Sequence, residues 1–166
     1  IVSGFTLENR LALDNRIQLE SGFTIQSSLY DQAISYSENL LKRKDFLKTP
    51  NNYGYATLFY NPIKSVNFSF NYIYTGEMVL LHLAGSPNQL NDEYIISPVF
   101  NEMGIKATYT SRLNRVGVDI DYSIGVKNLT NTYQQDFDTY KNRDSNFIYG
   151  PTMPRTYYFG LVLKSI

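Results

Sequence analysis

Three aspartates near the end of the chain have the type and spacing that could support binding chemistry. Asp136 and Asp138 lie two positions apart, and Asp144 follows in the same segment. Carboxylates at this spacing suit a calcium ion. Arg143 and Arg155 lie close by in the sequence, so the same carboxylates equally suit charge-assisted pairs that fix a loop to the rest of the protein. We favour the structural interpretation, because the segment also carries Pro and Gly residues typical of turns.

His82 is the single histidine of the chain, and Met78 precedes it by four positions. Imidazole and thioether groups both suit soft metal ions or haem iron. A lone histidine with no second ligand nearby is more often an ordinary loop residue. We therefore keep both residues as candidates for ligand contact, and we predict no metal site and no cofactor.

The chain lacks the residues that most catalytic sites need. It contains no Cys and one His, so most nucleophilic triads are unavailable. It also has no G-x-S-x-G, P-loop or G-x-G-x-x-G motif. We predict that the protein is not an enzyme. A hydrolase built from Ser, Asp and His82 is the alternative that the composition leaves open.

The composition excludes several further classes. The 166 residues carry 15 basic and 15 acidic side chains, a balance that argues against a nucleic-acid-binding protein. The aromatic content of 15% argues against intrinsic disorder. A mean hydropathy of −0.29 and the absence of a long apolar run argue against a membrane helix. The start at Ile1 suggests a removed signal peptide or a piece of a longer chain.

Alternation of apolar and polar residues dominates the chain and predicts β-strands. The segment Ile17–Leu29 is the clearest case, and it is long for a soluble strand, whose usual length is about 5–6 residues. The register of Tyr53–Tyr60 stays open, because this segment is aromatic on both faces. The seven predicted strands are Phe5–Leu13, Ile17–Leu29, Tyr53–Tyr60, Val66–Tyr74, Met103–Tyr109, Val116–Val126 and Tyr157–Leu163.

The connections between these strands are alternately short and long. The short ones are Asp14-Asn15, Asn61–Lys64 and Ser111–Arg115, and the long ones are Asp31–Asn52, Glu77–Pro98 and Asn128–Pro154. The long connections exceed the roughly 12–15 residues that compact domains usually tolerate. Strict alternation places every short turn at one end of the sheet. This is the anatomy of an outer-membrane β-barrel, with short periplasmic turns and long extracellular loops.

The two faces of the predicted strands fit the same architecture. The polar faces would line a lumen, and the apolar faces would contact lipid, with Tyr and Phe rings near the strand ends forming aromatic girdles. The predicted lumen residues are Glu20, Lys106, Asp119, Asp121 and Lys127. Of these, Asp119, Asp121 and Lys127 either contact another domain or line a solute path, or they are solvated wall residues that pair with one another. A soluble sandwich or a lipocalin-like barrel is the alternative fold, and we favour the membrane barrel.

The end and the middle of the chain resemble one known family. The matching pieces are G-V-K-N-L at Gly125–Leu129, the stretch Gln134–Asp138, Arg143-Asp144, Y-G-P and P-R at Tyr149–Arg155, and Tyr74–Met78 with His82 and Gly85 downstream. These pieces resemble TonB-dependent outer-membrane receptors, most of all those of Bacteroidetes-type bacteria in the siderophore, haem and cobalamin group. One difference is that the chain ends in Lys164-Ser165-Ile166, where such barrels commonly end in Phe.

The resemblance implies an antiparallel transmembrane β-barrel of 22 strands that encloses a plug domain. Residues 1–166 would then be seven strands in the last third of the barrel, with the plug and the earlier strands outside this sequence. The implied function is import of a scarce solute across the bacterial outer membrane by binding and energy-coupled gating. A non-transporting barrel that anchors or assembles a surface complex is the alternative.

The resemblance also implies partners. These are outer-membrane lipid and lipopolysaccharide, the receptor's own plug domain, and the TonB energy-coupling complex, which acts through that plug. A surface lipoprotein over the barrel mouth is a further candidate. The basic cluster Lys42-Arg43-Lys44 suits lipopolysaccharide phosphates or an anionic ligand, although a solvated loop explains it equally well.

Overall fold

A computed structural model describes residues 1–85, 88–139 and 141–165, so Ile166, which the sequence comparison with the usual terminal Phe concerns, lies outside the described residues. All the regular structure in this part is β-strand, and it contains no helix that is long and apolar enough to cross a membrane. The prediction of an all-β, antiparallel protein is confirmed. The strands are β1 (Val2–Leu13), β2 (Ile17–Ile34), β3 (Arg43–Asp45), β4 (Asn52–Ile63), β5 (Val66–Thr75), β6 (Val79–His82), β7 (Glu93–Ile96), β8 (Phe100–Leu113), β9 (Val118–Lys127) and β10 (Thr156–Ser165).

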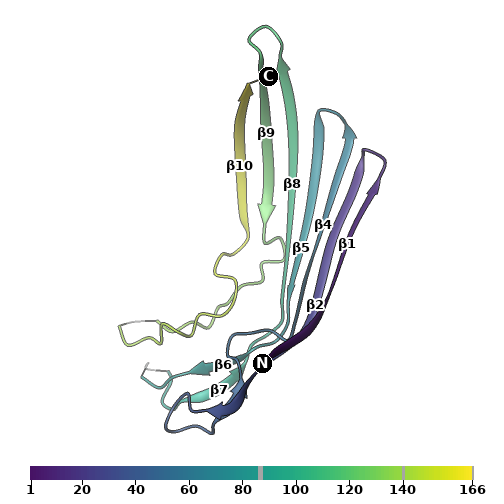
Figure 1. Cartoon of the computed structure of the whole chain (residues 1–166). Helices are drawn as coiled ribbons and strands as arrows, with labels where there is room; N and C mark the ends of the chain where they lie inside the picture. The colour runs from purple at the N-terminus through teal and green to yellow at the C-terminus, as the bar shows by residue number, and fades with distance from the viewer. Residues whose placement is uncertain (86–87, 140, 166) are drawn as a thin grey trace.

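Seven long strands form one antiparallel sheet in the order β1-β2-β4-β5-β8-β9-β10 (Figure 1). They are the seven strands that the alternation predicts. The short strand β3 pairs with the end of β2, and β6 and β7 form a separate two-stranded sheet. Neighbours in the long sheet are therefore joined either by a tight turn or by a long loop.

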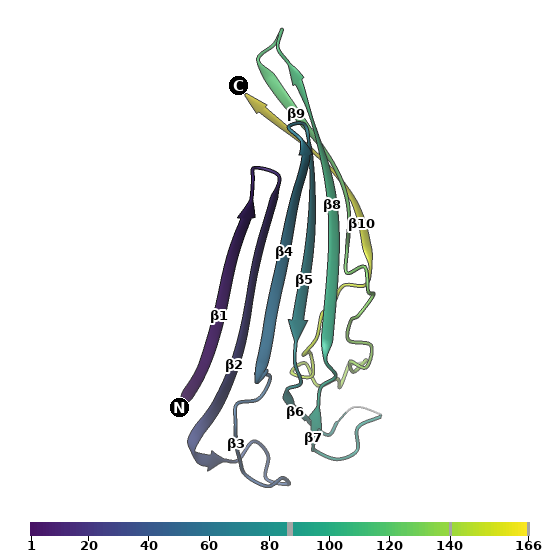
Figure 2. The ribbon, with the colours of Figure 1, turned by 90° about the vertical axis from the view of Figure 1, so that its right-hand side faces the viewer.

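The tight turns lie at one end of the long sheet, and the long loops lie at the other (Figure 1). Figure 2 shows the same separation after a quarter turn, with β3, β6 and β7 beyond the loop end of the strands. The first turn differs from the two-residue turn that we predicted. Leu13 pairs with Ile17, so three residues connect β1 and β2, and Asp14 adopts the left-handed conformation with φ 54°.

The turn between β8 and β9 also differs from the prediction. It spans residues 114–117 and ends at Gly117, whose φ of 64° suits a residue without a side chain. Val116 therefore lies in the turn with 67% of its surface exposed, and it does not belong to the strand.

The burial of the two sheet faces is the reverse of that in a soluble protein. On β2 the apolar residues Phe23 and Ile25 are 44% and 58% exposed, whereas Thr24 and Ser28 are 8% and 7% exposed. On this strand the apolar face is thus the more exposed one, and the polar face is the more buried one. The register also resolves the aromatic strand β4, because Tyr53 pairs with Thr24 and belongs to the polar face.

The charged residues predicted for the lumen lie on the polar face, where most are paired. Arg10 contacts Glu20 at 3.3 Å, Arg112 contacts Asp119 at 3.1 Å, and Lys164 contacts Asp121 at 2.6 Å. The Nζ of Lys127 lies 5.7 Å from the centre of the Tyr158 ring. These contacts link neighbouring strands within the wall itself.

Two glycines on the polar face make room for tyrosine rings. A Cβ atom at Gly22 would lie 2.6 Å from the ring of Tyr55, and one at Gly125 would lie 2.5 Å from the ring of Tyr158. Both distances are far below van der Waals contact. Each ring therefore lies flat against the neighbouring strand, at a position where only glycine leaves space.

The long loops contain more regular secondary structure than the sequence predicts. We call residues 35–51, 76–99 and 128–155 the first, second and third long loops. The first contains β3 and the second contains the hairpin of β6 and β7, so the prediction of plain loops is wrong for both. The buried apolar cluster of the described residues also lies at this end, and it consists of Met78, Leu80, Phe100 and Phe147.

Candidate functional site

The β6–β7 hairpin forms the centre of the loop end. Its strands pair from Val79 with Ile96 to His82 with Glu93. Two hydrogen bonds close its base, since the Met78 amide donates to Ser97 Oγ at 2.9 Å and the Ser97 amide donates to the Met78 carbonyl at 2.9 Å. Met78 and His82 are both buried, at 6% and 7% exposed. Alternate residues of β6 therefore face inward, toward the third long loop.

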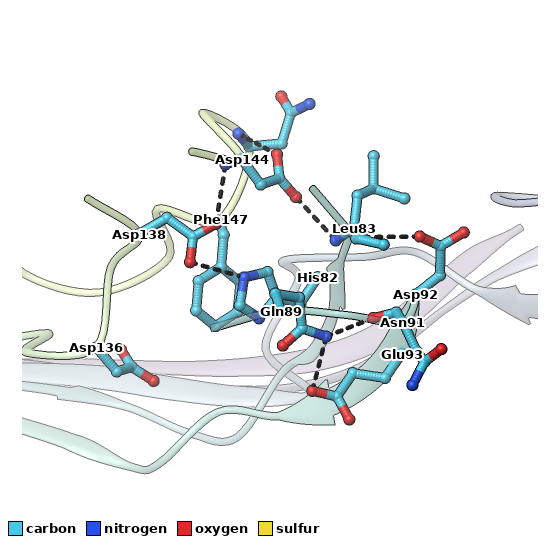
Figure 3. Close-up of polar contacts among 12 residues, drawn as sticks. His82, Leu83, Gln89, Asn91, Asp92, Glu93, Asp136, Asp138, Asp144 and Phe147 are labelled. Atoms are coloured by element: carbon cyan, nitrogen blue, oxygen red, sulfur yellow. Dashed lines mark hydrogen bonds and ion pairs between the residues drawn. The ribbon is translucent and has the colours of Figure 1, made fainter. Parts of the chain in front are cut away.

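His82 contacts Asp138 of the third long loop. Its Nε2 lies 3.0 Å from Asp138 Oδ1, and the two side chains are 9% and 7% exposed. The Phe147 ring stacks on the imidazole at a centroid distance of 3.7 Å and an angle of 2° (Figure 3). His82 is thus the central contact between the second and third long loops.

The aspartates of the third loop bind hydrogen-bond donors of the protein. Asp138 Oδ2 accepts the amide of Asp144 at 2.9 Å, and Asp144 Oδ2 accepts the amide of Leu83 at 3.1 Å. Both oxygens of Asp136 accept the hydroxyl of Tyr149 at 2.8 Å. Burial, together with the hydrogen bond to Asp136, raises the pKa of Tyr149 well above its ordinary value. The three carboxylates therefore organise the loop.

The expected pairs between aspartate and arginine do not form among the described residues. Arg155 donates instead to backbone and amide oxygens, from Nε to the Leu129 carbonyl at 3.0 Å and from its own amide to Asn131 Oδ1 at 2.9 Å. Arg143 is exposed. Within the described residues, Asp138 and Asp144 consequently tie the third loop to the second loop, and these contacts involve no arginine. No group of three or more potential metal ligands occurs within the described residues.

Asp92 joins the first long loop to the hairpin, a role that no sequence pattern predicted. Its carboxylate accepts the amide of Ala84 at 2.8 Å, the hydroxyl of Ser37 and the side-chain amide of Asn39 at 3.3 Å. The hydroxyl of Ser37, followed by the amide of Ala84, lowers the pKa of Asp92 below its ordinary value. The acid lies in a segment without periodicity, so no pattern distinguishes it.

Tyr94 of β7 makes a second contact with the first loop. Its hydroxyl donates to the Leu41 carbonyl at 3.1 Å, and the guanidinium of Arg43 lies 5.1 Å from its ring centre. Arg43, one of the three residues in the predicted basic cluster, is also paired with Asp45 at 2.8 Å. All three long loops are therefore connected through the β6–β7 hairpin.

The third long loop covers a cavity of about 360 Å³ at the loop end of the polar face. Glu102 and Lys127 from the sheet and Tyr149 from the loop bring a carboxylate, an ammonium and an aromatic ring to its wall. Asn128 helps to hold the loop over it, since its side-chain amide donates to the carbonyls of Thr132 and Met153 at 3.0 and 2.9 Å. The remaining lining residues are Thr75, Phe100, Asn128, Gly150, Pro151, Thr152, Met153, Pro154 and Thr156.

This arrangement suits reversible binding of a solute with polar and aromatic groups. A cavity lined by apolar side chains and a few polar groups is the usual form of a small-molecule site. His82 is buried against Phe147 and Asp138, and no serine hydroxyl of the described residues forms a hydrogen bond with it. The loop end therefore offers a cavity that can bind a solute and contacts that hold the three loops together.

Comparison with known proteins shows a similarity to a solved receptor structure. No family model matches the chain, and no curated protein matches it either. Among solved structures, the chain is similar to the siderophore receptor PiuA from Acinetobacter baumannii, with a TM-score of 0.62 and 13% sequence identity. The similarity covers 98% of this chain and 21% of that receptor. At this identity the match shows the fold alone: the sheet and its loops resemble about a fifth of a β-barrel receptor.

Proposed function

We propose that this chain is part of the wall and extracellular loops of a TonB-dependent outer-membrane receptor that imports a scarce solute. The observation that carries the proposal is the reversed burial of the sheet. Large apolar side chains such as Phe5, Phe159 and Leu163 are 68%, 69% and 65% exposed, while the opposite face is polar. Such a sheet is stable in a bilayer, where hydrocarbon covers the apolar face.

The fold comparison supports the same proposal. The similar structure is a siderophore receptor, so a ferric siderophore is the first solute class to test here, followed by haem and cobalamin. In this proposal the seven long strands are part of a 22-stranded barrel whose remaining strands and plug lie elsewhere in a longer protein. The link to Bacteroidetes-type receptors rests on sequence motifs alone.

The proposed mechanism is binding followed by gating, without covalent chemistry. The three connected loops and the cavity beside Glu102 and Lys127 would capture the solute outside the cell. The TonB complex would then move the plug and open a path along the polar face. Paired charges such as Arg112 and Asp119 would line this path and keep it hydrated.

Solute uptake tests the proposal. A strain that lacks the gene for the full-length protein is grown under iron limitation and supplied with labelled ferric siderophores, haem and cobalamin. We expect uptake of one of these to be lost, to return with the wild-type gene, and to require TonB. Unchanged uptake of all three, with the protein folded in the outer membrane, would instead favour the non-transporting barrel.

A further inference from the structure

The contact between the second and third long loops contains His82, the single histidine of the chain. Histidine gains or loses a proton between about pH 5 and 8. His82 lies 3.0 Å from Asp138, and the side chains are 9% and 7% exposed. A pair with so little exposure is screened weakly by water and salt. The strength of this contact therefore depends on the proton of the imidazole.

Within the described residues, the titratable side chain that forms an ion pair with the ring is acidic. Asp138 contacts the ring from the third loop, Asp144 accepts the amide of the neighbouring Leu83, and Glu93 is the cross-strand partner of His82 on β7 (Figure 3). The ring of Phe147 stacks on the imidazole, and an aromatic face attracts a cation. Protonation of His82 consequently adds attraction to each of these neighbours and adds no repulsion from them.

The pair also controls two backbone contacts. Asp138 holds the amide of Asp144 through its second oxygen, and Asp144 holds the amide of Leu83, the residue next to His82. The hydrogen bonds thus run from the hairpin to the third loop and back to the hairpin. Weakening the contact between His82 and Asp138 should therefore also weaken the hydrogen bonds of the Asp144 and Leu83 amides.

We propose that His82 and Asp138 are positioning residues that form a proton-dependent tie between the second and third long loops. The tie is tight when the imidazole is protonated and looser when it is neutral, because a hydrogen bond between two charged groups is about twice as strong as a neutral one. The inference rests on the proposed function in one respect, that these loops face the outside of the cell, where pH varies. It adds regulation of the loop end by external pH to that function.

Hydrogen exchange of single amides tests the tie in the full-length receptor held in lipid nanodiscs. Exchange is measured at about pH 5.5 and about pH 8 and corrected for the intrinsic rate. We expect the amides of Leu83 and Asp144 to open about fivefold to tenfold more often at the higher pH. The amide of Ala84 is the internal control, because it binds the carboxylate of Asp92, whose lowered pKa keeps it charged at both values.

Variants separate the proton effect from a merely structural role. His82→Gln cannot be protonated, so its exchange should be the same at both pH values. Asp138→Asn should also remove the pH dependence, and it provides the test if the first variant does not fold. Asp136→Asn is the matched control, because it alters a contact with Tyr149 and should leave the pH dependence intact.

Two results would overturn the tie. One is equal corrected exchange of Leu83 and Asp144 at both pH values in the wild type, and the other is an unchanged pH dependence in His82→Gln. Neither result depends on solute uptake. Failure of the tie is therefore distinguishable from failure of the proposed transport function.

Discussion

The side chain of Gln134 shows how a single residue holds the third long loop in place. It is 2% exposed, and its amide nitrogen donates to the Phe147 carbonyl at 3.0 Å. Its amide oxygen accepts the amides of Tyr149 and Gly150 at 2.9 and 3.3 Å. One side chain thereby satisfies three backbone groups, and it fixes Phe147 where that ring can stack on His82.

Replacing Gln134 by Leu should open the third loop. Leucine has a similar size and no polar atoms, so the three backbone groups would lose their partner at a cost of about 2–3 kcal/mol. Hydrogen exchange of the segment 144–150 in the full-length receptor would measure the loss as faster local opening. Gln135→Leu is the control, because this neighbour is exposed. Equal effects of the two changes would show that the buried contacts are not what holds the loop.

Part of the candidate site could be selected from the sequence by residue type. The contacts that these residues make could not be predicted. Histidine, aspartate and methionine were recognisable by their chemistry, so His82, Asp138 and Met78 were selected. The contact between His82 and Asp138 joins positions 56 residues apart. No periodicity connects such positions, because their proximity depends on how two loops fold over the end of a sheet. Gln134 and Asp92 were missed for the same reason.

At the scale of elements, alternation of side chains determines most of the fold. A strand with one polar and one apolar face has only one orientation in which both faces have a suitable environment, so its register is strongly specified. Seven long strands follow from this pattern. The strands β6 and β7 could not be predicted from it, because each has only four residues. Such short strands show too little alternation to be separated from loop sequence, and their pairing depends on the packing of the loops.

A charge on the apolar face should therefore cost far more than the same charge on the polar face. Phe70 lies in a row of cross-strand neighbours with Leu58 and Ile105. In the proposed membrane barrel, Phe70→Lys should destabilise the protein by about 2–4 kcal/mol if the position is near the bilayer midplane. Asn71→Lys, one position along on the polar face, should cost less than about 1 kcal/mol, because the lumen is hydrated.

The amount of folded receptor in the outer membrane measures this difference. At equal synthesis, the heat-modifiable form on a gel should decline strongly for Phe70→Lys and little for Asn71→Lys. Similar losses for both variants would contradict the assignment of the two faces.

At the scale of the whole molecule, the sheet has two unlike faces and two unlike ends. The faces separate apolar from polar side chains, and the ends separate tight turns from long loops (Figure 1). The strands β1 and β10 each pair on one side within this chain. An unpaired strand edge invites pairing with a further strand, and in the proposed barrel the rest of the receptor supplies it. The chain spans 21% of the similar receptor.

The two ends should lie on opposite sides of the outer membrane. Single cysteines are introduced at Asn88 and Asn142 in the second and third long loops and at Asn114 in a tight turn, all three of which are exposed. The 166 residues contain no native cysteine that would react with the reagent. A thiol reagent that does not cross the membrane should label Asn88→Cys and Asn142→Cys on intact cells and should leave Asn114→Cys unlabelled. Labelling of Asn114→Cys after the cells are permeabilised is the control for its reactivity. If it were labelled from outside while the loop cysteines were protected, the turn end would face outward, and the loops could not capture a solute from the surroundings.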